Sequence, residues 1–331
     1  MIQPNQADVI SRDSKIRGGV LGLAVGDALG VPVEFMRREA LFAQPVRGMQ
    51  GWGTHSQPPG TWSDDTSMAL CVLESITEKG WSIDDQAVRF VRWLTRAHLT
   101  AHDEVFDVGG ATRQSIERIS DGFRPLEAGC FEEDSNGNGS LMRNLPAALY
   151  CAALCTDDEL ALHIADTSSI THAHARSRLG CVIHALLVSE LLDGSDPADS
   201  IVNATGRLEA LRDTGPLPIE MRLELPHYET LLHSNFELAD ASEIPSSGYI
   251  VHTLEAALWC LLTSSSFSEC VLKAVNLGED TDTTAAVAGG LAGIYWGYES
   301  IPAEWLETLV KAEMISSMTS GFIAAIDGEA S

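Results

Sequence analysis

The chain has 331 residues, of which 45% are apolar and 21% charged, a composition typical of a globular protein with a sizeable core. Its 47 acidic and 21 basic side chains leave a formal charge of −26. This charge argues against a nucleic-acid backbone or an anionic membrane surface as the main partner, because both would be repelled. It suits a protein that gathers cations.

The seven cysteines form no CxxC pair and lie mostly in apolar helical stretches, so we expect reduced thiols and a cytoplasmic protein. The first residues lack the basic and then apolar pattern of a secretion signal, and the chain has no run of about 18 uncharged apolar residues. Neither secretion nor a membrane span is therefore expected.

Apolar residues recur mostly at helical spacing and no convincing alternating strand occurs, which predicts an all-α fold. Signals such as Gly80 after one helix, Ser82 before the next and Pro302 near a helical start delimit helices of medium length. Many such helices with short connections predict a compact bundle, here as a single domain over residues 1–331.

Glycine recurs at every fourth position in two stretches, one near each end of the chain. Residues four apart lie along one ridge of a helix, and each helix-interior glycine costs about 0.5 to 1 kcal/mol relative to alanine. Close packing of helix backbones explains such rows better than ligand contact, so we expect the two helices to pack together and bring their ends close. The positions are Gly18, Gly22, Gly26 and Gly30 in the first row and Ala285, Gly289, Gly293 and Gly297 in the second.

Two adjacent carboxylates and several hydroxyls stand at the start of a helix expected to run to about Lys79. Ser63, Asp64 and Asp65 form the centre of this segment. A helix N-terminus needs only one such oxygen to cap its unpaired N–H groups. Taken alone, the segment is most simply a cap.

A polar turn interrupted by glycines, Asn136 to Ser140, is expected to lead into a helix at residues 141–143. Its backbone N–H groups can receive phosphate or ribose oxygens, because glycine leaves no side chain in the way. An ordinary flexible turn is the simpler interpretation of the spacing alone. Further on, His172 and His174 invite a metal interpretation, but the absence of a neighbouring carboxylate makes a zinc site improbable.

The segment 193–247 is polar and contains five prolines, among them Pro216, Pro218, Pro226 and Pro245. Apolar positions such as Met221, Leu231 and Leu232 argue against simple disorder. We expect a peripheral helical insertion here.

A second group of acids and hydroxyls, centred on Asp280, Asp282 and Thr283, precedes the helix with the second glycine row. Hard oxygen donors suit Mg²⁺, Mn²⁺ or Ca²⁺. Four carboxylates brought together with Asp64 and Asp65 would repel each other, so this density implies bound cations, and two divalent ions fit better than one. The alternative is two independent helix caps that never meet.

Five strings along the chain carry a family resemblance: 26–30 (GDALG), 62–66 (WSDDT), 138–143 (NGSLMR), 170–172 (ITH) and 278–283 (GEDTDT). Their order resembles that of the ADP-ribosylglycohydrolase family, and in particular bacterial members of the dinitrogenase reductase activating type. Similarity over 247–259 extends the resemblance to roughly residues 16–310. It implies one all-α domain, an orthogonal multi-helix bundle, with two Mg²⁺ or Mn²⁺ ions in a cleft.

Carried over position by position, the resemblance implies three groups of site residues. Glu34 matches a mobile acidic residue beside the metals, although the residues alone favour a solvated loop acid. Asp107 matches an acid set against the scissile bond, and it is equally well explained as the N-cap of a helix from Ala111 to Ile119. The implied metal ligands are Ser63, Asp64, Asp65, Asp280, Asp282 and Thr283, and the implied ligand contacts are Gly109, Asn138, Gly139, Ser140, Met142 and His172.

The chain departs from the family pattern at two positions. Ser63 stands where threonine is common and keeps the oxygen needed for ligation. Glu279 stands where a second glycine often occurs, adding one charge beside the metals.

The resemblance implies hydrolysis of the glycosidic bond at C1 of the distal ribose of an ADP-ribosyl group, releasing ADP-ribose. In this hypothesis Asp64 or Glu34 positions or deprotonates water and Asp107 assists ring opening or the leaving group. Arginine-linked ADP-ribose is the expected substrate, with serine-linked or small-molecule conjugates as alternatives, and a monomer is expected. The competing hypotheses are a non-catalytic binder of ADP-ribose and metal, and a phosphohydrolase, for which the chain lacks a Gly-Lys-Ser/Thr phosphate loop.

Overall fold

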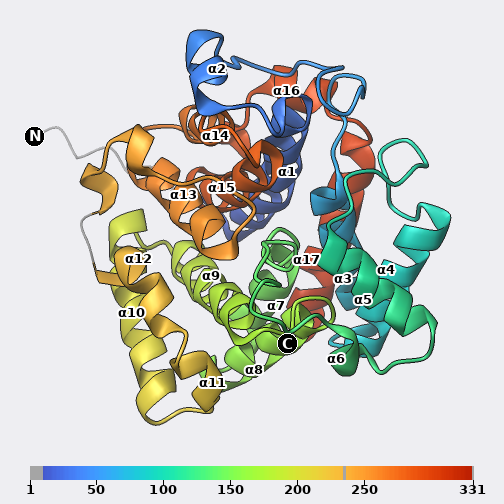
Figure 1. Ribbon diagram of the computed structural model, residues 1–331, viewed down its shortest axis with the longest axis vertical. Helices are drawn as coiled ribbons and strands as arrows, with labels where there is room; N and C mark the ends of the chain where they lie inside the picture. Colours follow the sequence, from blue (N-terminus) through green and yellow to red (C-terminus); the bar gives the residue numbers. More distant parts are fainter. Residues whose placement is uncertain (1–9, 234–235, 330–331) are drawn as a thin grey trace, which may run out of the picture.

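Helices account for the regular structure of this protein (Figure 1). The computed structural model describes residues 10–233 and 236–329, and these contain no strand beyond isolated bridges, so the all-α prediction is confirmed. Residues 1–9, 234–235 and 330–331 lie outside the described residues. The expectation that the first residues are not a secretion signal falls largely on this part of the chain. The α-helices are α1 (Arg12–Gly30), α2 (Arg38–Ala43), α3 (Asp64–Lys79), α4 (Ile83–Arg96), α5 (Gly110–Ser120), α6 (Pro125–Ala128), α7 (Leu145–Leu154), α8 (Asp157–Ser169), α9 (Ala175–Asp193), α10 (Pro197–Asp213), α11 (Ile219–Arg222), α12 (Glu229–His233), α13 (Ile250–Leu262), α14 (Phe267–Asn276), α15 (Thr281–Trp296), α16 (Ala303–Thr308) and α17 (Ala312–Glu329). The 3-10 turns are η1 (Val31–Val33), η2 (Leu225–Tyr228), η3 (Phe236–Leu238), η4 (Ala241–Glu243) and η5 (Tyr298–Ser300).

The two glycine rows lie against each other, as the sequence predicts. A Cβ atom added to Gly22 would lie 2.3 Å from the carbonyl oxygen of Gly289, and one added to Gly289 would lie 2.2 Å from that of Gly22. At one end of the contact a Cβ on Gly18 would lie 2.1 Å from the Gly293 carbonyl, and at the other a Cβ on Gly30 would lie 2.3 Å from Asp282 Cα. Helices α1 and α15 therefore run antiparallel in backbone contact, and the end of α1 meets the start of α15.

Helix α1 is the central helix of the core. The stretch Arg12–Val33 is long and apolar enough to cross a membrane by length and composition alone, but 94% of its most apolar window is buried inside the protein. Helices α14, α15 and α17 pack against it, and α13 and α9 cover α15 in turn. Burial by these neighbours accounts for its apolar surface.

The segment 193–247 forms helices at one edge of the molecule, drawn in yellow in Figure 1. Helix α10 lies on α8 and α9, and η2 also contacts α9. The hydroxyl of Tyr228 donates a hydrogen bond to the carbonyl oxygen of Arg176 at 2.8 Å. This contact joins the segment to the start of α9.

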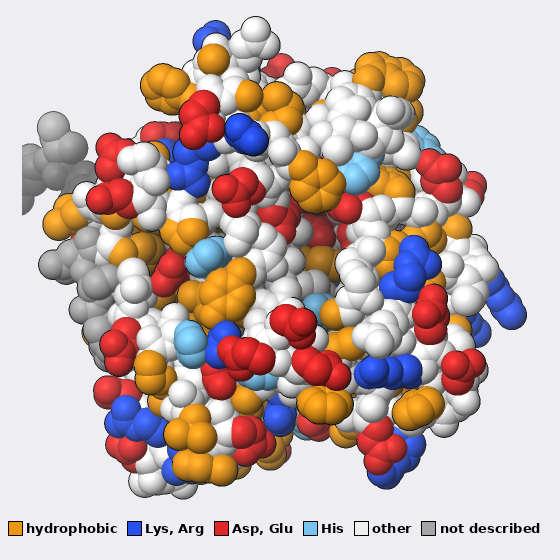
Figure 2. All heavy atoms as spheres, in the orientation of Figure 1, with side chains coloured by type: hydrophobic (Ala, Val, Ile, Leu, Met, Phe, Trp, Pro, Cys, Tyr) orange, Lys and Arg blue, Asp and Glu red, His pale blue; other side chains and the backbone are white. Residues whose placement is uncertain are grey.

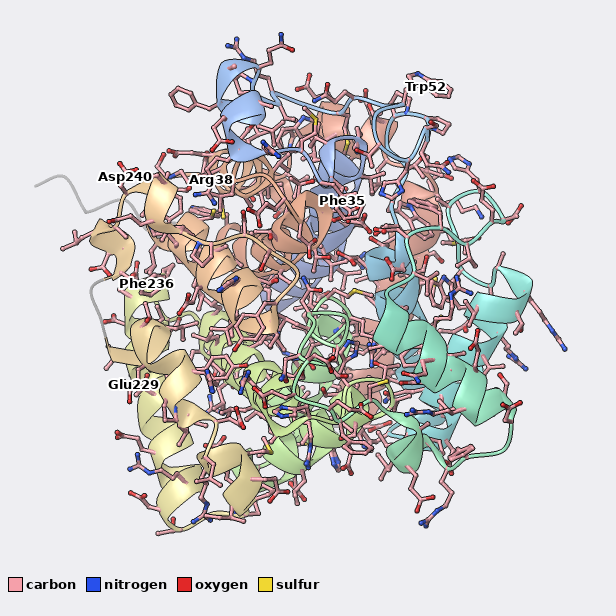
Figure 3. All side chains as sticks on the ribbon, viewed as in Figure 1. Phe35, Arg38, Trp52, Glu229, Phe236 and Asp240 are labelled. Carbon is pink, nitrogen blue, oxygen red and sulfur yellow. The ribbon has the colours of Figure 1, made fainter. Side chains whose placement is uncertain are left out.

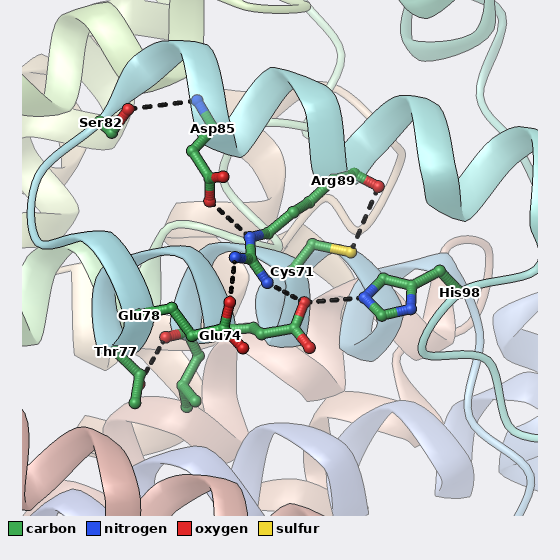
Figure 4. A network of polar contacts seen from close by, with 9 residues as sticks. Cys71, Glu74, Thr77, Glu78, Ser82, Asp85, Arg89 and His98 are labelled. Carbon is green, nitrogen blue, oxygen red and sulfur yellow. Dashed lines mark hydrogen bonds and ion pairs between the residues drawn. The ribbon is translucent and has the colours of Figure 1, made fainter.

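A buried arginine holds α3 against α4 (Figure 4). The Arg89 guanidinium donates to Asp85 at 2.6 Å, to Glu78 at 2.7 Å and to Glu74. Its side chain is only 3% exposed, so its charge is neutralised mainly by these carboxylates. The ion pairs fix the body of α3, whose first turn carries Asp64 and Asp65.

We expect Gly22→Ala to destabilise the protein by about 3 kcal/mol, because the new methyl group would force α1 and α15 apart. Urea denaturation followed by far-ultraviolet circular dichroism measures this loss. Gly206 is the matched control, since it lies in α10 and a Cβ there meets nothing within 4 Å. Gly206→Ala should be stabilised by up to about 1 kcal/mol, and equal losses in the two variants would contradict the packing explanation.

Candidate active site

A cleft of about 700 Å³ opens where the end of α1, the starts of α3 and α15 and several loops meet. Red carboxylates surround the hollow near the centre of the face in Figure 2. The sequence-predicted residues that line the cleft are Glu34, Asp64, Asp65, Asp107, Gly109, Asn138, Gly139, Met142, His172, Asp280 and Thr283. The predicted residues that do not line it are Ser63, Ser140 and Asp282.

The start of α3 is held by Asp27, a residue to which sequence reasoning assigned no role. Its carboxylate accepts hydrogen bonds from the backbone N–H of Ser63 at 2.9 Å, the N–H of Thr66 at 3.0 Å and the Thr66 hydroxyl at 2.6 Å. Burial raises the pKa of Asp27 to about 6 in spite of these bonds. The available signal was a carboxylate in the last turn of an apolar helix, where an acid is rarely left without partners.

The two acidic segments form one cluster and are not independent caps. The Thr283 hydroxyl donates to Asp65 Oδ1 at 3.3 Å. Carboxylate oxygens of Glu34, Asp280 and Asp282 lie within 4.8 Å of one another, so Asp282 belongs to the cluster although it does not line the cleft. Ser63 still caps α3, since its hydroxyl accepts from the N–H of Asp65.

The chemistry of this cluster fits divalent cations. One oxygen each of Asp65 and Asp282 is buried with no hydrogen-bond partner, which is costly for a carboxylate. Burial raises the pKa of Asp64, Asp65 and Asp282 well above the usual range, and repulsion from neighbouring carboxylates raises them further. Hard oxygen donors with free lone pairs are the ligands that Mg²⁺ and Mn²⁺ prefer.

The loop that carries Glu34 is tied down on two sides, so Glu34 is not a solvated loop acid. The Thr54 hydroxyl donates to the backbone carbonyl of Glu34 at 2.7 Å, and His55 Nε2 is hydrogen-bonded to the Glu34 carboxylate. Next to it, the N–H of Phe35 donates to the carbonyl of Glu279 at 2.6 Å. His55 is a second residue that sequence reasoning missed, because no local pattern links it to a loop 21 residues away.

Asp107 lies on the same side of His55 as Glu34, with Oδ1 4.0 Å from His55 Nε2. Carboxylate oxygens of Glu34 and Asp107 and a ring nitrogen of His55 lie within 4.8 Å of one another. The alternative that it caps the next helix is wrong, because α5 begins at Gly110 with Gly109 as its N-cap and no side-chain cap. Asp107 has a φ of +55°, a backbone conformation uncommon for residues other than glycine. Asp107 lines the cleft.

The glycine turn connects the cleft to the acidic cluster. Asn138 Nδ2 donates to Asp280 Oδ2 and to the Thr253 hydroxyl, both at 2.8 Å. Asn138 thus supports an acid in addition to lining the cleft. Residues 141–143 continue as a turn, and α7 begins only at Leu145.

Ser140, one of the implied ligand contacts, does not line the cleft, and its side chain points behind it. Its hydroxyl accepts from Ser168 at 2.9 Å and contacts Cys181 Sγ at 3.3 Å. His172 does line the cleft, whereas His174 lies outside it and pairs with Glu133 at 3.2 Å.

Phe35 lies near the middle of the face in Figure 3, with 67% of its surface exposed.

The sequence profile of the ADP-ribosylglycohydrolase family matches residues 8–330. The chain belongs to this family. It is 33% identical over 311 residues to the ADP-ribosylarginine hydrolase Tri1 of Serratia proteamaculans, covering 92% of this chain and 77% of that protein. It is 32% identical over 295 residues to the ADP-ribosyl-[dinitrogen reductase] glycohydrolase of Rhodospirillum rubrum, covering 88% and 89%.

A solved structure described as an ADP-ribosylglycohydrolase-related protein complex superposes on this ADP-ribosylglycohydrolase with a TM-score of 0.77 and 33% sequence identity. The alignment covers 95% of this chain and 99% of that one. The fold and the family read from the five sequence strings are thereby confirmed.

We expect Asp27→Asn to destabilise this ADP-ribosylglycohydrolase by about 1 to 3 kcal/mol. The amide NH₂ would face backbone and hydroxyl donors that now bond to carboxylate oxygens. Chemical denaturation measures the change. Asp84, exposed in the first turn of α4, is the control, and Asp84→Asn should stay within about 0.5 kcal/mol of the parent.

Adding Mg²⁺ or Mn²⁺ should raise the melting temperature, with a stabilisation of about 2.7 kcal/mol at 100 times the dissociation constant. Asp282→Asn should show opposite effects in two conditions. With EDTA it should be more stable than the parent, because one repelling buried carboxylate is gone, and with metal it should lose most of the gain. Asp199→Asn, an exposed acid of α10, should respond to metal as the parent does. Equal metal responses of all three proteins would show that the cluster binds no cation.

Proposed function

We propose that this ADP-ribosylglycohydrolase hydrolyses the glycosidic bond at C1 of the distal ribose and releases ADP-ribose from arginine side chains of modified proteins. The observation that supports it most strongly is the buried acidic cluster at the floor of a cleft in this family's fold. The names of the two bacterial relatives, one an ADP-ribosylarginine hydrolase and one a glycohydrolase acting on dinitrogen reductase, support a protein substrate.

Two divalent cations, Mg²⁺ or Mn²⁺, are the proposed cofactors. When bound, they would act as Lewis acids that orient the ribose hydroxyls and a water molecule. The residues that would hold them are Ser63, Asp64, Asp65, Asp280, Asp282 and Thr283. The orphaned oxygens of Asp65 and Asp282 favour this assignment, while the Ser63 hydroxyl already serves as a cap.

Glu34, Asp64 and Asp107 are the proposed catalytic residues, because their carboxylates line the cleft from three different segments. Burial raises the pKa of Glu34 to about 8, partly offset by the hydrogen bond with His55 and reinforced by Asp107 and Asp280. A group that holds or releases a proton near neutral pH can exchange it with water, and Glu34 or Asp64 fills this role. Asp107 faces the cleft, where its negative charge would stabilise positive charge on the ribose ring as the leaving group departs.

The cleft lining favours a cationic leaving group such as the guanidinium of arginine. Glu132 and Asp134 join Glu34 and Asp107 in the lining, so the cleft is rich in negative charge. Phe35 adds an exposed aromatic ring, and planar cations stack favourably on such faces. The contacts proposed for the ADP-ribosyl group itself are Gly109, Asn138, Gly139, Met142 and His172.

A cytoplasmic monomer is the proposed state of the protein. All seven cysteines are free and six are buried, which suits a reducing compartment. Every residue of the proposed site comes from one chain, so a single domain over 1–331 would suffice without a partner subunit.

The decisive measurement is ADP-ribose release, followed by chromatography, from an arginine-ADP-ribosylated protein and a serine-ADP-ribosylated peptide in parallel. We expect release from the arginine substrate with Mg²⁺ or Mn²⁺ and none with EDTA. Asp282→Asn should lower the rate at least about 100-fold, and Asp199→Asn should leave it unchanged.

Three outcomes would contradict parts of this proposal. Release only from the serine peptide would show that the protein cleaves the serine linkage and not the arginine linkage. Tight binding of ADP-ribose without release from any conjugate would indicate a non-catalytic binder. Release of AMP in place of ADP-ribose would indicate a phosphohydrolase.

A further inference from the structure

A fully buried arginine behind the cleft has no carboxylate partner among the described residues. Arg143 is 0% exposed and forms no ion pair with the residues described in 10–233 and 236–329. Its guanidinium donates to the Thr171 hydroxyl at 2.7 Å, to the carbonyl of Gly139 and weakly to that of Thr167, and it lies 4.8 Å from the ring centre of Phe90. Burying an unpaired cation is costly, so we expect Arg143 to have a role beyond packing.

The chemistry of arginine fixes the direction of the hydrogen bonds that follow. A guanidinium only donates, so the Thr171 hydroxyl must accept from Arg143. Its single proton is then available for His172 Nδ1, which lies 2.7 Å away. A hydroxyl oxygen can accept two hydrogen bonds, but the Thr171 proton has no other acceptor among the described residues. His172 Nδ1 is therefore the acceptor, and the ring proton of the neutral imidazole lies on Nε2.

The other side of the imidazole ring lies at the glycine turn of the cleft. A Cβ atom on Gly139 would lie 2.8 Å from His172 Cε1, and one on Gly137 would lie 3.6 Å from Nε2. Both glycines line the cleft together with His172. The absence of side chains at this turn leaves the imidazole edge accessible to a ligand.

We propose that Arg143 and Thr171 are positioning residues, which hold His172 as the Nε2–H tautomer so that it donates a hydrogen bond to an oxygen of the ADP-ribosyl group. This inference rests on the proposed function. Burial and the nearby Arg143 lower the pKa of His172 to about 3, which agrees with a neutral ring. A neutral donor backed by a buried cation suits phosphate and ribose oxygens in a cleft otherwise rich in carboxylates.

Thr171→Val tests the relay, since it keeps the shape of the side chain and removes the hydroxyl. We expect ¹⁵N spectra of the His172 ring to show Nε2 protonated in the parent and a shift toward Nδ1 protonation in Thr171→Val. Spectra of His172→Gln identify the signals. Calorimetry should show about 10-fold weaker binding of ADP-ribose in Thr171→Val.

Matched variants separate the relay from general damage. Thr171→Ser keeps the hydroxyl and should restore both the tautomer and the affinity. Ser169→Ala removes a nearby hydroxyl whose one hydrogen bond within the described residues is to the carbonyl of Ala165, and it should change neither. The double variant Thr171→Val with His172→Phe should bind ADP-ribose no more weakly than His172→Phe alone.

The outcomes also separate this inference from the proposed function. A parent protein that fails to bind ADP-ribose would overturn the proposed function. A parent that binds, together with an unchanged tautomer in Thr171→Val, would overturn the relay alone. So would additive losses in the double variant, because Thr171 would then act independently of His172.

Discussion

The backbone contact between α1 and α15 is the constraint on which the site depends. Helices that pack through ordinary side chains lie about 8 to 10 Å apart, whereas the glycine rows allow carbonyl oxygens to touch the opposite backbone. Because the helices run antiparallel, the end of α1 reaches Asp282 at the start of α15. From that end, Asp27 reaches across to hold the first turn of α3. One glycine contact thus brings three helix ends, each with its own carboxylates, to one place.

The assembled site then carries a charge that the fold alone does not balance. Asp64, Asp65 and Asp282 are almost fully buried, and two of their oxygens have no partner. Divalent cations would offset this repulsion and also help an acidic protein to accept an anionic diphosphate. Behind the glycine turn the fold buries the cation Arg143, which is linked to the cleft through Thr171 and His172. The cleft therefore combines a carboxylate cluster suited to metal with a neutral imidazole donor backed by positive charge.

The sequence predicts what local chemistry determines. Glycines at every fourth position predicted the contact between α1 and α15. Ser63 and Ser82 marked helix starts, because each side chain accepts a hydrogen bond from a backbone N–H two or three residues further on. Sequence reasoning missed Asp27 and His55, whose partners lie many residues away and whose roles depend on the tertiary arrangement. The same limit explains the position of Ser140, since a turn can expose glycine and asparagine while directing the adjacent hydroxyl inward.

Glu279 shows how a departure from the family pattern acts through the backbone as well as through charge. Its φ is +61°, in the left-handed region that glycine adopts without strain and that costs other residues about 1 kcal/mol. The position is held by the N–H of Phe35, which donates to its carbonyl, and by its own N–H, which donates to Met36 at 2.8 Å. Phe35 is also left-handed, with a φ of +63°. The loop of Glu34 and the loop of Asp280 are therefore joined by two strained residues, so movement of either acid requires the other loop to follow or these two hydrogen bonds to break.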